Sequence, residues 1–111
     1  MALTFKEYSD KSFSRNKSYD VSFKLPICVL GLAGEAGEVS EKFKKMYRDA
    51  NGVISDEFKR DVTKELGDVL WYINEISREL DINLEDVAKA NIDKLEKRFK
   101  NKTLAGNGDN R

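Results

Sequence analysis

The sequence predicts an all-α protein, a bundle of four helices that forms one domain. Its single proline is Pro26, and glycine is sparse before the C-terminal residues. Leucine, isoleucine and valine recur at spacings of three and four residues among many charged side chains, a pattern typical of amphipathic helices. A length of 111 residues suffices for one domain and is too short for two.

The first two helices are delimited by a polar connection and by a proline. We expect the first helix over residues 4–17, where the apolar pattern is the least regular, and a polar connection over residues 18–25. Pro26 fits the first turn of the second helix, because a missing N–H costs little there. This helix is expected to continue to about residue 48, before the turn residues 49–52.

The last two helices begin at residues that favour helix starts. Ser55 is a candidate N-cap for the third helix, which is expected to run to about residue 80. Asn83 is a candidate N-cap for the fourth, which is expected to run to about residue 100. We therefore assign the helical domain to residues 1–102 and a glycine-rich tail to residues 103–111.

Two long apolar stripes run along the second and third predicted helices. Their members alternate in spacing between four and three residues, which predicts that the two helices pack lengthwise and bury these side chains. The predicted core residues are Leu32, Ala36, Val39, Phe43 and Met46 in the second helix and Val62, Leu66, Val69, Ile73, Ile76 and Leu80 in the third.

The composition excludes several classes of function. Because the chain contains no histidine, it cannot use Ser-His or Cys-His catalysis, His-ligated zinc or a Glu-x-x-His di-iron site. Its one cysteine, Cys28, lies in an apolar run and is expected to be buried and inert. Twenty basic and twenty acidic residues cancel, which argues against a nucleic-acid partner. The chain also shows no membrane span and no signal peptide, so we expect a cytoplasmic protein.

Two acidic pairs occupy matching positions beside the apolar stripes. Glu35 and Glu38 lie about 60° and about 120° from the centre of the stripe in the second helix, on one side of it. Glu65 and Asp68 lie at the same two angles in the third helix, and both pairs enclose a glycine. If the stripes pack antiparallel, the two pairs can meet at one edge of the bundle. A solvated surface would explain one such pair, but two pairs in the same phase indicate a shared site.

Four carboxylates gathered at one edge would repel one another unless a cation compensates their charge. Oxygen ligands without histidine or thiolate select hard ions, namely Mg²⁺, Mn²⁺ or Ca²⁺. Mg²⁺ commonly binds through carboxylates together with substrate phosphates, so a nucleoside polyphosphate is the expected ligand. Gly37 and Gly67 lie in the middle of predicted helices, where glycine is costly, and Gly31 and Gly34 add to the cost. A close approach by backbone, ion or ligand would explain these glycines.

Residues 31–39 (GLAGEAGEV) and 64–72 (KELGDVLWY) resemble the two halves of the MazG-like nucleotide pyrophosphohydrolase signature, E-x-x-E followed after a spacer by E-x-x-D. Residues 90–98 are similar to the fourth-helix segment of that family, and residues 106–111 resemble the tail of a small single-domain branch. The first predicted helix matches only loosely. Since that region helps to shape the base pocket in relatives, the resemblance does not indicate a base.

The resemblance implies hydrolysis of a nucleoside triphosphate to a monophosphate and pyrophosphate with Mg²⁺, or with Mn²⁺ in its place. It also implies a tight homodimer or a dimer of dimers (a homotetramer) with sites near the subunit contacts. House-cleaning of the nucleotide pool would be the purpose. By matching position, the residues that would form the catalytic centre as ligands of the metal are Glu35, Glu38, Glu65 and Asp68.

Four further residues would bind substrate by the same resemblance. Asn91 and Lys94 would help to bind phosphate or metal, although taken alone they read as an exposed polar helix surface. Tyr72 would contact the nucleotide; the alternative interpretation is that it is an amphipathic residue at the edge of the apolar stripe. Arg111, in the glycine-rich tail, would reach phosphate if the tail closes as a lid.

Two alternatives remain open from the sequence. One is a relative that acts specifically on dUTP, dCTP or a phosphoribosyl-nucleotide. The other, from a different class, is a non-catalytic helical binding or regulatory module that has kept the fold.

Overall fold

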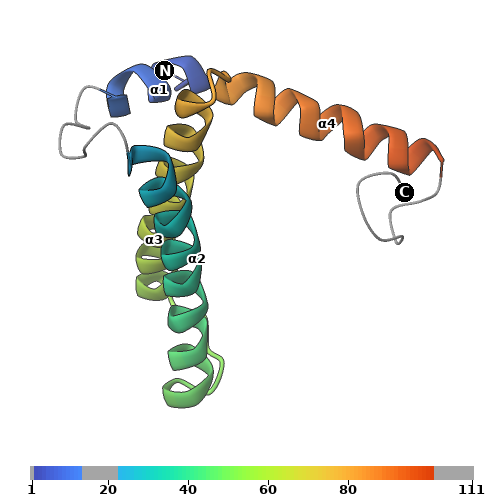
Figure 1. Cartoon of the computed structure of the whole chain (residues 1–111). Helices are drawn as coiled ribbons and strands as arrows, with labels where there is room; N and C mark the ends of the chain where they lie inside the picture. The colour runs from blue at the N-terminus through green and yellow to red at the C-terminus, as the bar shows by residue number, and fades with distance from the viewer. Residues whose placement is uncertain (1, 14–22, 102–111) are drawn as a thin grey trace.

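The computed structural model of the chain describes residues 2–13 and 23–101. This part of the chain is entirely helical and contains no strand, so the all-α, four-helix prediction is confirmed. The predicted tail lies outside the described residues. The helices, labelled in Figure 1, are α1 (Phe5–Phe13), α2 (Lys24–Asp49), α3 (Asp56–Glu79) and α4 (Leu84–Lys100). None of them is both long enough and apolar enough to cross a membrane.

The helix ends follow local sequence. The side chain of Ser55 accepts a hydrogen bond from the backbone N–H of Phe58 at 3.0 Å, which confirms it as the N-cap of α3. Asn83 is the N-cap residue of α4, but its side chain makes no capping hydrogen bond. After α3, Asp81 adopts a left-handed conformation with φ of 58°, and the N–H of Ile82 reaches back to the carbonyl of Ser77 at 2.8 Å. These contacts end α3 sharply and redirect the chain into α4.

The helices form a hairpin with an arm rather than a closed bundle. α2 and α3 pack lengthwise, α1 lies across the end of this hairpin, and α4 extends away from the corner (Figure 1). Among the described residues, α4 contacts α1 and α3 but not α2. Within one chain, therefore, the four helices do not lie side by side as a bundle would require.

The apolar core is small and covers only part of the predicted stripes. Met46 is buried, and Phe43 meets Phe58 edge-on with ring centroids 5.0 Å apart. Leu66 and Leu80, however, are 52% and 53% exposed. The prediction that the whole stripe is core was wrong at three positions: Ala36, Leu66 and Leu80. One partner helix covers a strip narrower than the stripe, so residues at its margin face outward.

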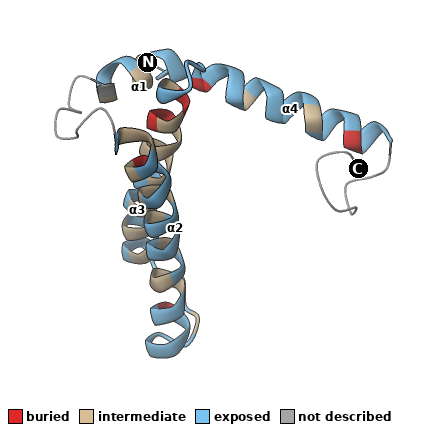
Figure 2. Ribbon diagram, viewed as in Figure 1, coloured by how far each residue is buried: buried red, intermediate tan, exposed pale blue. Residues whose placement is uncertain are grey.

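The most deeply buried cluster is polar and lies where α1 crosses the hairpin, the region with most of the buried residues in Figure 2. Glu75 is 0% exposed and Asn74 is 1% exposed. The Glu75 carboxylate lies 4.0 Å from Lys24 Nζ and 3.6 Å from Arg78 Nε. Asn74 donates a hydrogen bond to Ser12 Oγ at 2.9 Å. Ion pairs and hydrogen bonds thus connect α1 and the start of α2 to α3.

Cys28 lies beside this cluster and is completely buried, as the sequence predicted. Burial raises the pKa of its thiol, and the negative charge of Glu75 raises it further. A thiol whose pKa is raised carries little thiolate, the reactive form. Cys28 therefore acts as a buried, unreactive side chain that fills space in the core.

Candidate functional site

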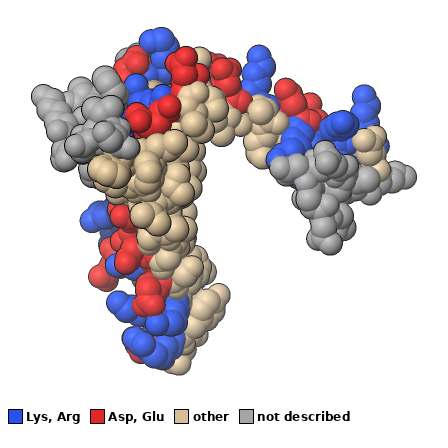
Figure 3. All heavy atoms as spheres, in the orientation of Figure 1, with Lys and Arg blue, Asp and Glu red and all other residues tan. Residues whose placement is uncertain are grey.

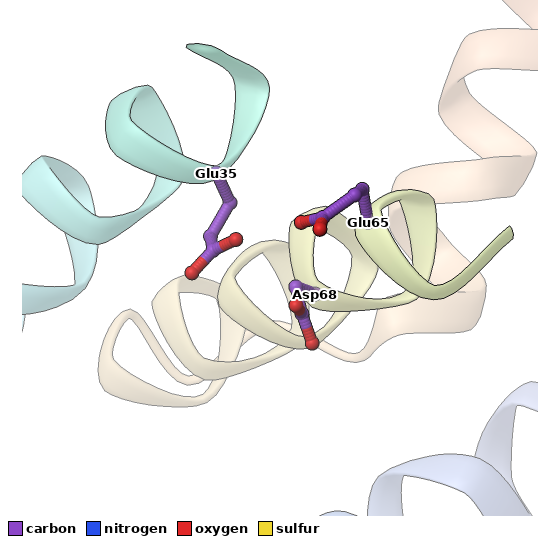
Figure 4. A group of neighbouring side chains, drawn as sticks. All are labelled: Glu35, Glu65 and Asp68. Atoms are coloured by element: carbon purple, nitrogen blue, oxygen red, sulfur yellow. The ribbon is translucent and has the colours of Figure 1, made fainter. Parts of the chain in front are cut away.

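Three of the four predicted carboxylates come together between α2 and α3. Glu35 projects from α2 toward Glu65 and Asp68 on α3, as Figure 4 shows. One carboxylate oxygen from each residue lies within 4.8 Å of the others. Because Glu65 and Asp68 are three residues apart, they share one side of α3. The antiparallel packing then brings Glu35 opposite them, as the two matched acidic pairs predicted.

The close approach of these carboxylates has an electrostatic cost. Partial burial raises the pKa of Glu35, and the charges of Asp68, Glu65 and Glu38 raise it further. A nearby cation would reverse this effect, because it favours the ionised form of every carboxylate around it. The arrangement is therefore destabilising by itself and is suited to a bound positive charge.

Glu38, the fourth predicted ligand, occupies a different position. It is exposed and is not one of the three residues whose oxygens converge. Its charge nevertheless contributes to the raised pKa of Glu35. Glu38 thus borders the cluster without completing it, because its place on α2, one turn beyond Glu35, turns it farther from α3.

The geometry of the three carboxylates fits one hard cation. Two oxygens on opposite sides of one ion lie about 4.2 Å apart for Mg²⁺ and about 4.8 Å apart for Ca²⁺, from metal–oxygen distances of about 2.1 and about 2.4 Å. The observed limit of 4.8 Å falls at the upper end of this range. A ligand set made only of carboxylate oxygens favours Mg²⁺, Mn²⁺ or Ca²⁺ over softer metals. Three protein ligands also leave coordination positions for water or phosphate.

A cavity of about 310 Å³ lies between α1 and α3. Its lining residues are Leu3, Tyr8, Lys11, Ser12 and Trp71. Trp71 follows Asp68 by three residues on α3, so the two side chains are surface neighbours. Burial raises the pKa of the Tyr8 phenol, and the charges of Glu75 and Asp68 add to the rise, which places this phenol within electrostatic reach of the carboxylate cluster.

Tyr8 is a residue that sequence reasoning did not connect with the site. It lies sixty positions before Asp68, in the predicted helix with the least regular pattern, and no motif marks it. Trp71 is half-buried and lines the cavity that α1 helps to close.

Tyr72 lies at the contact between the two hairpin helices. A methyl group built at Gly31 would overlap the Tyr72 ring, with the Cδ1 atom only 2.9 Å away. The ring also meets Trp71 edge-on, with centroids 5.0 Å apart and an angle of 87° between the planes. Of the mid-helix glycines at which a close approach was expected, Gly31 is therefore covered by an aromatic ring, whereas a Cβ atom at Gly34, Gly37 or Gly67 would have nothing within 4 Å.

The remaining predicted substrate-binding residues are not brought to the carboxylates by this chain alone. Asn91 and Lys94 lie on α4, which projects away from the hairpin (Figure 1). Asn91 is exposed and Lys94 is half-buried. Arg111 lies outside the described residues.

Comparison with known proteins agrees with this site. Residues 26–103 match the model of the MazG nucleotide pyrophosphohydrolase domain, a stretch that holds all three converging carboxylates. The chain is also similar to the "Gene 37 protein" of Mycobacterium phage L5, with 44% identity over 87 residues, which are 78% of this chain and 76% of the relative. No solved structure matches the chain.

Proposed function

Because the chain belongs to the MazG nucleotide pyrophosphohydrolase family, we propose that it hydrolyses a nucleoside triphosphate to a nucleoside monophosphate and pyrophosphate with Mg²⁺. The observation that carries this proposal is the convergence of Glu35, Glu65 and Asp68 on a point between two helices. Clearing unwanted nucleotides from the pool, including noncanonical or deoxy forms, is the purpose we infer.

Each part of the site has a distinct task in this reaction. Glu35, Glu65 and Asp68 would hold the metal. A bound divalent ion would supply charge for the phosphate oxygens and would lower the pKa of a water molecule that it binds. The cavity between α1 and α3 would receive the nucleoside, since Tyr8 and Trp71 offer aromatic faces for base stacking. A volume of about 310 Å³ is at the lower end of the range for small-molecule sites, about 300–1,000 Å³.

The test is a panel of nucleotides assayed for pyrophosphate release with Mg²⁺ or Mn²⁺. It should include the canonical triphosphates, dUTP, dCTP and a phosphoribosyl-nucleotide. We expect release from at least one triphosphate and dependence on the metal, so that a chelator abolishes it. Absence of release from every nucleotide would contradict the proposed activity and leave a non-catalytic binding module as the better account.

We also propose that the protein is a homodimer or a dimer of dimers. Figure 3 shows a band of uncharged side chains along the hairpin, on the side beneath α4, with the charged side chains gathered opposite. Leu30 is 72% exposed on α2, and Phe99 is 75% exposed on α4. Large apolar surfaces of this kind mark protein contacts.

Sedimentation equilibrium measures this directly. We expect a mass of two or four times the 12.7 kDa of one chain. An acidic substitution of the exposed Leu30 on α2, Leu30→Glu, should shift the protein toward monomer. Lys44→Glu, on an exposed residue that pairs with Glu41, should not. A monomer for the unmodified protein at micromolar concentration would overturn the proposal.

A further inference from the structure

We propose that Gly31 and Tyr72 are positioning residues that set the distance between α2 and α3 at the carboxylate site. The inference rests on the proposed function, because it assumes that Glu35, Glu65 and Asp68 bind a metal. It goes beyond that function in assigning a task to a glycine that carries no ligand atom. It also gives the Tyr72 ring a task that does not require contact with the nucleotide.

Gly31 differs from the other helical glycines in its surroundings. A Cβ atom at Gly31 would overlap the Tyr72 ring, whereas a Cβ atom at Gly34, Gly37 or Gly67 would have nothing within 4 Å. The ring thus occupies the space that a side chain at position 31 would fill. A glycine there lets an aromatic residue of α3 lie directly against the backbone of α2.

The register of the two helices ties this contact to the carboxylates. Gly31 precedes Glu35 by one turn on α2, and Tyr72 follows Asp68 by one turn on α3. Residues four apart share a helix face and are separated by about 6 Å along the axis. The Gly31–Tyr72 contact therefore lies one turn from the place where Glu35 meets Asp68. A change in helix separation at the first contact would be transmitted to the second.

The Tyr72 ring has little freedom to move away from an added methyl group. Trp71 meets it edge-on at 5.0 Å, and the ring is half-buried in the seam between the helices. A methyl at position 31 would instead push the helices apart at this end of the hairpin. The carboxylate oxygens lie within 4.8 Å of one another, which equals the separation of two oxygens on opposite sides of Ca²⁺ and exceeds the separation of about 4.2 Å for Mg²⁺. A small separation would therefore weaken metal binding.

The experiment is to measure Mn²⁺ affinity by electron paramagnetic resonance with the full-length protein and the metal alone. We expect Gly31→Ala to weaken Mn²⁺ binding by about 10- to 100-fold, the effect typical of losing a residue that orients metal ligands. Gly34→Ala and Gly37→Ala are matched controls, since they make the same change on the same helix without a clash. They should bind Mn²⁺ as the unmodified protein does.

Variants at Tyr72 separate the ring from its hydroxyl. Tyr72→Phe should retain Mn²⁺ affinity because the ring remains. An alanine at position 72 leaves room for the methyl group of an alanine at position 31. The double variant Gly31→Ala, Tyr72→Ala should therefore bind Mn²⁺ no more weakly than Tyr72→Ala alone. This pair supplies the test if the single Gly31→Ala variant fails to fold.

The outcomes distinguish the two proposals. If the unmodified protein binds Mn²⁺ and Gly31→Ala binds it equally well, the positioning inference is wrong and the proposed function stands. The positioning inference is also wrong if the double variant binds Mn²⁺ more weakly than Tyr72→Ala by the full factor that Gly31→Ala costs on its own. If the unmodified protein binds no Mn²⁺, the metal site of the proposed function is wrong, and with it the inference. Mn²⁺ binding without hydrolysis of any nucleotide would contradict only the proposed activity.

Discussion

Replacing Asp68 with asparagine is expected to reduce pyrophosphate release by at least about 100-fold, because removing part of a metal centre commonly costs this much or more. The substitution keeps the size of the side chain and removes one of three converging negative charges. It also removes a charge that acts on both Glu35 and Tyr8. Metal affinity and activity should therefore fall together.

The same substitution should stabilise the protein when no metal is present. The charge of Asp68 raises the pKa of Glu35, so the two carboxylates repel each other in the folded state. In the presence of a chelator, we expect Asp68→Asn to have a higher melting temperature than the unmodified protein. Adding Mg²⁺ should raise the melting temperature of the unmodified protein but not that of Asp68→Asn. Thermal unfolding with and without Mg²⁺ measures both effects. A structural role for Asp68 would lower the melting temperature in both conditions.

Asp61→Asn is the matched control for this experiment. Asp61 is a half-buried aspartate two turns earlier on the same face of α3, and it is not one of the converging residues. Its substitution should leave pyrophosphate release within about threefold of the unmodified protein. Equal losses for Asp61→Asn and Asp68→Asn would show that charge on α3 in general, rather than the cluster, supports activity.

Replacing Glu75 with alanine is expected to lower the free energy of unfolding by about 3–5 kcal/mol, the usual cost of removing one partner from a buried ion pair. Glu75 is fully buried and lies 4.0 Å from Lys24 and 3.6 Å from Arg78. Removing this carboxylate would leave the side chains of Lys24 and Arg78 with less compensating negative charge in a poorly solvated part of the protein. Small domains are stable by only about 5–15 kcal/mol, so this loss is a large part of the total.

Urea unfolding followed by circular dichroism measures the change, with Glu79→Ala as the control. Glu79 also pairs with Lys24, at 3.4 Å, but its side chain is 25% exposed. A solvent-screened pair contributes little, so this control should lose only about 1 kcal/mol. If Glu75→Ala were no more destabilising than Glu79→Ala, the buried ion pairs of Glu75 would not be what holds the start of α2 against α3.

The helices themselves were predictable because helix formation depends on residues a few positions apart. Ser55 was recognised as a cap from its own type and from the acidic first turn behind it, and the structure shows that capping bond. Pro26 was placed correctly in the first turn of α2. The i, i+3 spacing of Glu65 and Asp68 likewise predicted one shared helix face. The sequence predicted that four carboxylates meet, and the structure brings three of them together.

Packing between distant segments decided the rest. The sequence predicted an apolar core, but the structure buries Glu75 because Lys24 lies near it across fifty residues of chain. Tyr8 is within reach of Asp68 only because α1 crosses the end of the hairpin. The rotation of α2 against α3 leaves Glu38 outside the cluster.

The sequence by itself thus determined the helices, their ends and the acidic pairs, since these follow from steric and hydrogen-bonding rules within about one helix turn. Only the tertiary structure decided which carboxylate stands apart, which aromatic rings border the site and where α4 points. Those features depend on helix rotation, helix separation and one bend at Asp81. Each is set by the sum of many weak contacts between residues far apart in the chain, which no local pattern records.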